Sequence, residues 1–202
     1  MAHARQKIVL GAAGLLFLVL VAGCATTSRK VTMLYQPVVH DGKGAGTMYL
    51  AGVPGSTDRA DIQWIVGTMK NSDGATVGDI VSPIAPADLV TDALNQELAA
   101  AGYSVSSVEA LPSTAAKGIV VTGVDIHMND VASLIKEEGT SRLKITVELW
   151  KNGAKFKKLS YESSFSDFAI KDRDQLLPTT LQKALQGAMD RAVPEIIAAF
   201  EH

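Results

Sequence analysis

The chain has 202 residues, with 19 basic and 21 acidic side chains, so its formal net charge at pH 7 is −2. Proteins that bind nucleic acid usually carry a basic stripe and have a domain pI above about 9. The mild acidic balance of this chain does not fit that pattern. We therefore expect no nucleic-acid partner. The chain is long enough to bury a core of its own, because a domain of more than about 150 residues removes most of its surface from water.

The N-terminus has the order of features of a secretory signal. Arg5 and Lys7 precede an apolar run over residues 8–21, as a charged segment precedes the hydrophobic core of a signal peptide. The run is shorter than the roughly 18 to 20 apolar residues that a spanning helix needs. It ends in Leu-Val-Ala-Gly-Cys at residues 20–24, which resembles the lipobox of bacterial lipoproteins. The resemblance implies cleavage before Cys24, the sole cysteine, and attachment of lipid, palmitate included, to its sulfur.

The expected mature protein is one domain on a lipid anchor. Residues 1–23 are the predicted signal peptide, residues 24–30 a lipidated tether that spans about 20 Å at most, and residues 31–202 a single periplasmic α/β domain. Ala25 follows the cysteine where, in many Gram-negative lipoproteins, Asp retains the product at the inner membrane. We therefore expect the periplasmic face of the outer membrane. With Cys24 acylated, no thiol remains for a disulfide.

Short strands and one helix are predicted in the first half of the domain. The strands are indicated by alternating apolar residues and by turn residues between them. They lie at residues 31–36, 47–53, 62–70 and 76–81. A helix follows from Pro86 to Ala101, because its apolar residues recur at helical spacing and Gly102 suits the C-terminal cap. Asp92 and Glu97 are predicted to be solvated on its polar face.

A strong strand signal lies at residues 119–128, after a shorter strand at residues 103–108. Apolar side chains fall on both faces of the longer strand, so we expect it to be covered on both sides at its start. Asp125, His127 and Asp130 gather near its end. A metal site needs three or four convergent ligands with supporting groups. Because nothing else in the sequence offers a matching spacing, we predict a solvated strand end and no metal.

The clearest alternation in the chain begins after a polar connection at residues 133–140. Apolar residues alternate with polar ones over residues 143–149, so one face is core and Lys144 faces water. Asn152 and Gly153 suit the two positive φ angles of a type I′ hairpin turn. The sequence therefore predicts a β-hairpin.

The returning strand of this hairpin, at residues 155–165, carries a basic patch. Its apolar residues do not all fall on alternate positions, and a bulge near Lys157 and Lys158 would bring them onto one face of the strand. Four lysines lie at or beside the turn: Lys151, Lys155, Lys157 and Lys158. One interpretation is a charged tip that keeps the protein soluble. The alternative is contact with anionic lipid headgroups or an acidic partner.

A long helix closes the chain at residues 176–200, where apolar residues form a stripe at helical spacing. Pro178 is tolerated in its first turn, and Pro194 should kink or split it. The predicted fold class is α+β: a mixed or antiparallel sheet of about five to seven strands, with the two main helices packed on one face.

Two segments carry a resemblance to a known family. Residues 86–98 read Pro-Ala-Asp-Leu-Val-Thr-Asp-Ala-Leu-Asn-Gln-Glu-Leu, and residues 101–105 read Ala-Gly-Tyr-Ser-Val. With the segment at residues 66–71 and the lipobox, this order resembles the YajG-like family of bacterial lipoproteins. The resemblance covers the chain from about Asp58 onward and implies an outer-membrane-attached periplasmic α/β domain. It brings no catalytic residue.

No catalytic or cofactor motif accompanies these features. The sequence has no Gly-x-Ser-x-Gly elbow, His-Glu-x-x-His helix, dinucleotide fingerprint or P-loop, so we predict no catalytic residue and no cofactor. The leading hypothesis is a non-enzymatic binding or assembly module of an envelope protein complex. One alternative is a regulatory activator of a peptidoglycan-building enzyme. Another is a hydrolase of envelope glycans or lipids.

Overall fold

The computed structural model describes residues 27–38, 44–52 and 63–201. Cys24, the signal segment and parts of two loops lie outside these residues. The elements, in chain order, are β1 (Thr27–Lys30), β2 (Thr47–Ala51), β3 (Trp64–Lys70), β4 (Thr76–Ser82), α2 (Pro86–Ala100), β5 (Ser104–Val108), β6 (Lys117–Ala132), β7 (Glu137–Lys151), β8 (Ala154–Ala169), η1 (Arg173–Gln175) and α3 (Leu176–Glu201). Within the same ranges, neither helix is both long and apolar enough to cross a bilayer.

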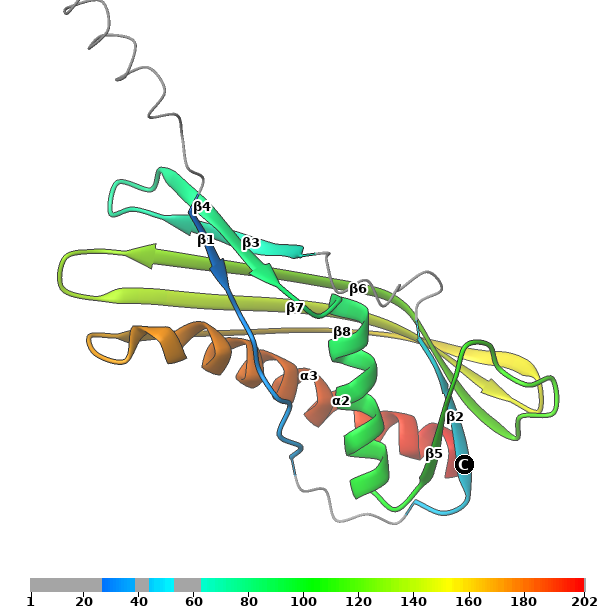
Figure 1. Cartoon of the computed structure of the whole chain (residues 1–202). Helices are drawn as coiled ribbons and strands as arrows, with labels where there is room; N and C mark the ends of the chain where they lie inside the picture. The colour runs from blue at the N-terminus through cyan, green and yellow to red at the C-terminus, as the bar shows by residue number, and fades with distance from the viewer. Residues whose placement is uncertain (1–26, 39–43, 53–62, 202) are drawn as a thin grey trace, which may run out of the picture.

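The three longest strands of the sheet, β6, β7 and β8, pair antiparallel to one another (Figure 1). In β7 the alternation of the sequence becomes an alternation of burial, with Ile145 and Val147 fully buried and Lys144 exposed. Asn152 and Gly153 have positive φ angles of 52° and 76°, as a type I′ turn requires. The predicted hairpin and its core face are therefore confirmed.

Two β-bulges set which side chains of the long strands reach the core. In β6, Val121 pairs with Val147 and Gly123 with Thr146, so Thr122 is an additional residue. This bulge brings odd-numbered residues before it and even-numbered residues after it to the core face. The prediction that β6 is covered on both sides at its start is confirmed, because Gly118 is buried and Val120 half-buried on the opposite face, against the loop after β5. In β8 the additional residue is Phe156, beside the predicted position.

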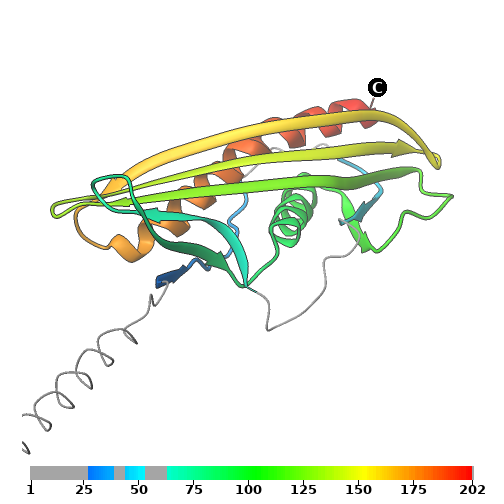
Figure 2. The ribbon, with the colours of Figure 1, turned by 90° about the horizontal axis from the view of Figure 1, so that it is seen from above.

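The remaining strands attach to one edge of β6 in two separate groups. β2 pairs with β6 near its start, at residues 118–120, and also pairs with β5. β3 pairs with β6 near its end, at residues 128–131, and continues through β4 to β1. Among the described residues the mixed sheet thus has eight strands. Figure 2 shows α2 between the two groups.

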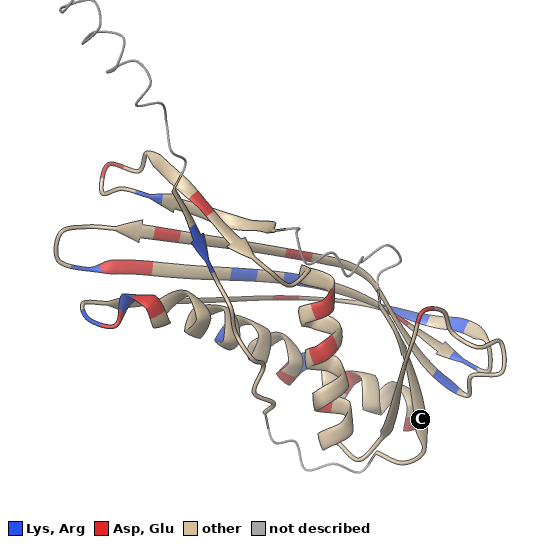
Figure 3. Ribbon diagram, in the orientation of Figure 1, with Lys and Arg blue, Asp and Glu red and all other residues tan. Residues whose placement is uncertain are grey.

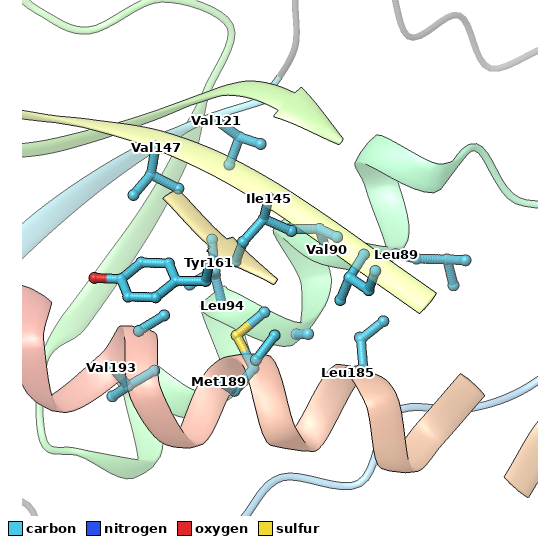
Figure 4. Packing of buried hydrophobic residues seen from close by; sticks show 14 of the residues in the cluster. Leu89, Val90, Leu94, Val121, Ile145, Val147, Tyr161, Leu185, Met189 and Val193 are labelled. Atoms are coloured by element: carbon cyan, nitrogen blue, oxygen red, sulfur yellow. The ribbon is translucent and has the colours of Figure 1, made fainter. Parts of the chain in front are cut away.

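Both helices are held by apolar faces. Every residue of the predicted stripe of α3 is buried: Leu177, Leu181, Ala184, Leu185, Ala188, Ala192, Ile196 and Phe200. The helix packs against β7 and β8 and also contacts α2, which packs on β6 and β5. In Figure 4, side chains of α2, α3 and the sheet meet in one core. Pro194 does not split α3, which continues to Glu201. The α+β fold class, with two helices on one sheet, is confirmed.

Two boundaries differ from the predictions. Thr27–Lys30, assigned to the tether, form strand β1, whereas residues 31–36, predicted as a strand, have no regular structure. The polar connection after β6 is shorter than expected, because β7 already begins at Glu137. The domain therefore starts only three residues after Cys24.

Candidate functional site

The long strands give the domain two ends, and each carries a distinct site. The strand register places Thr27, Gly78, Met69 and Asp130 side by side; we call this the proximal end. Val120, Trp150 and Gly153 lie at the other end of β6 and β7, which we call the distal end. Ten residues of extended strand separate the two ends, a distance of roughly 30 Å.

An apolar pocket of about 290 Å³ opens at the distal end. Its walls come from the ends of β2 and β7, the start of β6, the β7–β8 turn and the loop after β5. The lining residues are Ala51, Gly52, Glu109, Ala110, Leu111, Pro112, Ser113, Ala115, Val120, Trp150 and Gly153. Glu109 is the one ionisable side chain among them. Apolar walls with few polar groups are typical of ligand and anchor pockets.

Short backbone contacts fix the loop that covers this pocket. The amide of Gly153 donates to the carbonyl of Ala115 at 3.3 Å, and the amide of Asn152 donates to that of Ala116 at 3.3 Å. A Cβ on Gly153 would lie 2.4 Å from the carbonyl oxygen of Ser113, so only glycine allows this approach. The β7–β8 turn and the loop after β5 therefore form one unit.

Trp150 gives the pocket its one unusual polar feature. The indole Nε1–H is buried and has no hydrogen-bond partner among the described residues. A buried donor without an acceptor is costly, by about 1 to 3 kcal/mol, and tryptophan N–H groups usually find a partner when buried. Because this nitrogen is shielded from solvent, a guest in the pocket would contact the indole ring and not its N–H. The sequence did not indicate Trp150, because the alternation of β7 explains its position without a ligand.

The four lysines of the predicted basic patch lie beside this pocket, at the hairpin tip (Figure 3). Lys155 pairs with Glu148 at 3.2 Å, and Lys157 pairs with Glu195 at 2.9 Å. Lys151 and Lys158 are exposed. Two of the four charges are thus paired within the domain, Lys151 lies near Glu201 of α3, and none of the four lysines lines the pocket.

The proximal end is built around Arg29. Its guanidinium donates to Asp130 Oδ2 at 2.8 Å, to Glu137 Oε1 and to the carbonyl of Arg173. The two carboxylates are almost fully buried. We call these residues, Arg29, Asp130 and Glu137, the Arg29 cluster. It joins β1, β6, β7 and η1, so the first residues of the described chain are bound to the body of the domain.

The Arg29 cluster holds two carboxylates for one guanidinium. Burial, together with the nearby charge of Glu137, raises the pKa of Asp130, although Arg29 acts against the shift. Burial alone would lower the pKa of Arg29, but Glu137 and Asp130 outweigh it and raise that pKa. Asp130 Oδ1 has no hydrogen-bond partner among the described residues. The three residues therefore form a structural ion-pair cluster in which one oxygen of Asp130 stays without a hydrogen bond.

The acidic residues singled out in the sequence do not come together. Asp125 and His127 are exposed on β6, as predicted for a solvated strand end, but the prediction is wrong for Asp130, which is buried because the bulge at Thr122 turns even-numbered residues to the core face. Across the described ranges there is no group of three or more His, Cys, Asp or Glu that could hold a metal ion.

Glu97 was predicted to be solvated, and this prediction is wrong. Its side chain is fully buried in α2, where it accepts from the Tyr35 hydroxyl and from the Val38 amide at 2.7 Å. Burial and this carboxylate raise the pKa of Tyr35. Glu97 therefore fastens the irregular segment at residues 31–38 to the helix. Asp92 is exposed, as expected.

Comparison with known proteins shows a shared fold. No protein-family model matches the sequence, and no curated protein matches it. The structure is similar to that of a Xanthomonas campestris protein of the DUF330 family, with a TM-score of 0.50 and 10% identity over 87% of this chain and 97% of that one. A homologue of the neuraminyllactose-binding haemagglutinin of Helicobacter pylori gives a TM-score of 0.43 and 10% identity over 84% of this chain and 97% of that one.

Proposed function

We propose that this protein is a lipid-anchored, non-catalytic binding module of an envelope complex, and that its partner binds at the distal pocket. The observation that carries the proposal is the open apolar pocket at the distal end, with Trp150 in its wall. The YajG-like resemblance of the α2 segment belongs to the same proposal, and the fold shared with the DUF330 protein is compatible with it.

The anchor would hold the proximal end close to the bilayer. Cys24 precedes Thr27 by three residues, which span at most about 11 Å when extended. Because β1 is bound through the Arg29 cluster, the domain cannot swing away on a longer tether. Ala25 at the position after the cysteine supports retention at the outer membrane. The distal pocket would then face the periplasm, roughly 30 Å from the proximal end.

The pocket favours an apolar side chain on a peptide segment. A volume of about 290 Å³ accommodates one or two large side chains, and the indole ring of Trp150 offers them an aromatic wall.

Site-specific photocrosslinking in intact cells tests the pocket. We expect a crosslinker at Ser113, an exposed residue that lines the pocket, to capture one envelope protein, and Trp150→Phe to weaken that capture. The matched control is a crosslinker at His127, which is exposed on β6. Equal capture from both positions, or capture from Ser113 that ignores Trp150→Phe, would contradict the proposal.

The anchor is tested separately by labelling with radioactive palmitate. We expect label in the wild-type protein and none in Cys24→Ser, which should accumulate as an uncleaved or mislocalised precursor. Membrane fractionation should place the wild-type protein with the outer membrane. Equal labelling of both proteins would show that Cys24 is not the site.

A further inference from the structure

Four large apolar side chains are exposed together at the proximal end. Leu134 and Ile135 lie in the β6–β7 turn and are 101% and 75% exposed, and Phe168 and Ile170 at the end of β8 are each 60% exposed. We call these four residues the proximal tip. Single exposed apolar side chains are normal on a protein surface, but a group of them marks an interaction site.

The register of the sheet places the four residues next to one another. Phe168 pairs with Glu138 and Ala169 with Glu137, so Ile170 follows directly beside the β6–β7 turn. Arg173 of η1 donates to the carbonyl of Ile135 at 3.2 Å, which holds the two segments together. Figure 2 shows this turn and the segment from β8 to α3 at one extremity of the sheet.

We propose that the proximal tip inserts its apolar side chains into the lipid bilayer to which the protein is anchored. The inference rests on the lipid anchor of the proposed function. The described chain begins at Thr27, in register with Asp130 through β4 and β3, only two residues before Ala132, where β6 ends. A lipid on Cys24, at most about 11 Å from Thr27, would therefore enter the bilayer beside the tip.

The Arg29 cluster makes the anchor and the tip act as one unit. Arg29 on β1 binds Asp130 and Glu137, the residues that flank the β6–β7 turn on its two strands. The first described residues after Cys24 are thus fixed to the base of the tip. Two membrane contacts on one rigid body restrict its orientation, whereas a flexible single anchor does not.

The charges around the proximal tip indicate which force drives its contact. Lys136 and Lys171 are exposed there, but so are Glu138, Asp167 and Asp172, and Lys136 pairs with Glu138. A mixed set of charges gives no strong attraction to anionic headgroups. The contact should therefore depend on apolar burial and change little with salt concentration.

Lipid quenching of a fluorescent label tests the tip. The full-length protein, processed in cells, is purified with a single added thiol at Leu134→Cys or Phe168→Cys and labelled with an environment-sensitive dye. It is then reconstituted in vesicles of phosphatidylethanolamine and phosphatidylglycerol that contain brominated lipid. We expect blue-shifted emission and strong quenching at both tip positions. Labels at His127→Cys, in the middle of β6, and Ala154→Cys, at the distal end, should show neither.

The outcomes separate the tip from the anchor. Mass spectrometry of the N-terminal peptide reports whether Cys24 is acylated, and an unmodified Cys24 would overturn the anchor. Quenching at residue 134 no stronger than at residue 127, in protein that is acylated, would overturn the tip contact. If the tip label is shielded from a soluble quencher without lipid quenching, the tip contacts protein, such as a second copy of this chain, and the assignment to lipid is wrong.

Discussion

Among the described residues, the proximal and distal ends each contain one buried polar atom without a hydrogen-bond partner, but in opposite surroundings. At the proximal end the atom is Asp130 Oδ1, next to a guanidinium and a second carboxylate. At the distal end it is the indole N–H of Trp150, beside an apolar pocket. The other carboxylate oxygen of Asp130 is already paired with Arg29. The indole of Trp150, in contrast, makes no polar contact with the described residues.

This difference separates a structural role from a binding role. The Arg29 cluster connects segments more than 100 residues apart in the sequence. The free-energy cost of the unpaired Asp130 oxygen is therefore offset by the contacts that the cluster makes. The pocket makes no such connection through Trp150. The unpaired donor of Trp150 fastens no second segment, and the two ends can be told apart by which substitutions affect stability and which affect binding.

The largest effect is expected in the strand that both ends share. Ile145 in β7 is fully buried, so Ile145→Asp places a charge in the core and should reduce the free energy of unfolding by several kcal/mol. Lys144→Asp, on the exposed face, should change it by only about 0.5 kcal/mol. Chemical denaturation measures both. Similar losses would mean that the two faces of β7 are assigned wrongly.

The next effect is confined to the proximal end. Arg29→Met removes the partner of two buried carboxylates and should reduce the free energy of unfolding by about 2 to 4 kcal/mol. The matched control is Arg142→Met, because Arg142 is exposed on β7. Hydrogen exchange should show the loss at β1 and the β6–β7 turn, while the distal strand ends keep their protection. A loss in Arg142→Met as large as in Arg29→Met would contradict the role of the cluster.

Local patterns predicted most elements of the fold, because most of them depend on neighbours in sequence. The alternation of residues 143–149, the Asn152-Gly153 turn and the stripe of α3 all have local causes. Strand β1 could not be predicted this way. Thr-Ser-Arg-Lys has no apolar alternation, and it forms a strand because β4 pairs with it and Arg29 binds residues 101 and 108 positions away.

The sites were less predictable than the fold for the same reason. The distal pocket combines parts of β2, β6, β7 and the loop after β5, and no sequence spacing brings these together. The bulge at Thr122 puts Ile119 and Val121 on the same core face as Met128, since a single additional residue reverses the alternation beyond it. Glu97 looked like a solvated residue because its partners, Tyr35 and Val38, lie about 60 positions earlier.

A smaller effect should come from Asp130, with a definite pH dependence. Its pKa is raised in the folded state by burial and by Glu137, so its contribution to stability is complete below the pKa of the unfolded chain and is lost as pH rises through the raised pKa. Asp130→Asn removes this loss and keeps the pair between Arg29 and Glu137. The variant should therefore gain stability relative to wild type as pH rises from acid to neutral.

Thermal unfolding of both proteins over this pH range measures the difference. The change should be smaller than the loss in Arg29→Met, because the guanidinium keeps one carboxylate partner. Asp125→Asn serves as the control, since Asp125 is exposed on the same strand. A variant Asp130→Asn that loses stability steadily against wild type as pH rises would mean that Arg29, and not burial, dominates the pKa of Asp130.

The smallest effect on stability and the sharpest effect on binding should come from Trp150→Phe. The indole N–H has no partner to lose among the described residues, and phenylalanine keeps an aromatic wall in the pocket, so the free energy of unfolding should change by no more than about 1 kcal/mol. Photocrosslinking from Ser113 should nevertheless fall, because phenylalanine offers the guest a smaller aromatic surface than the indole. If instead Trp150→Phe unfolds the distal end and lowers crosslinking only in proportion, the indole is a structural side chain. Trp150 would then serve stability, as the Arg29 cluster does at the proximal end.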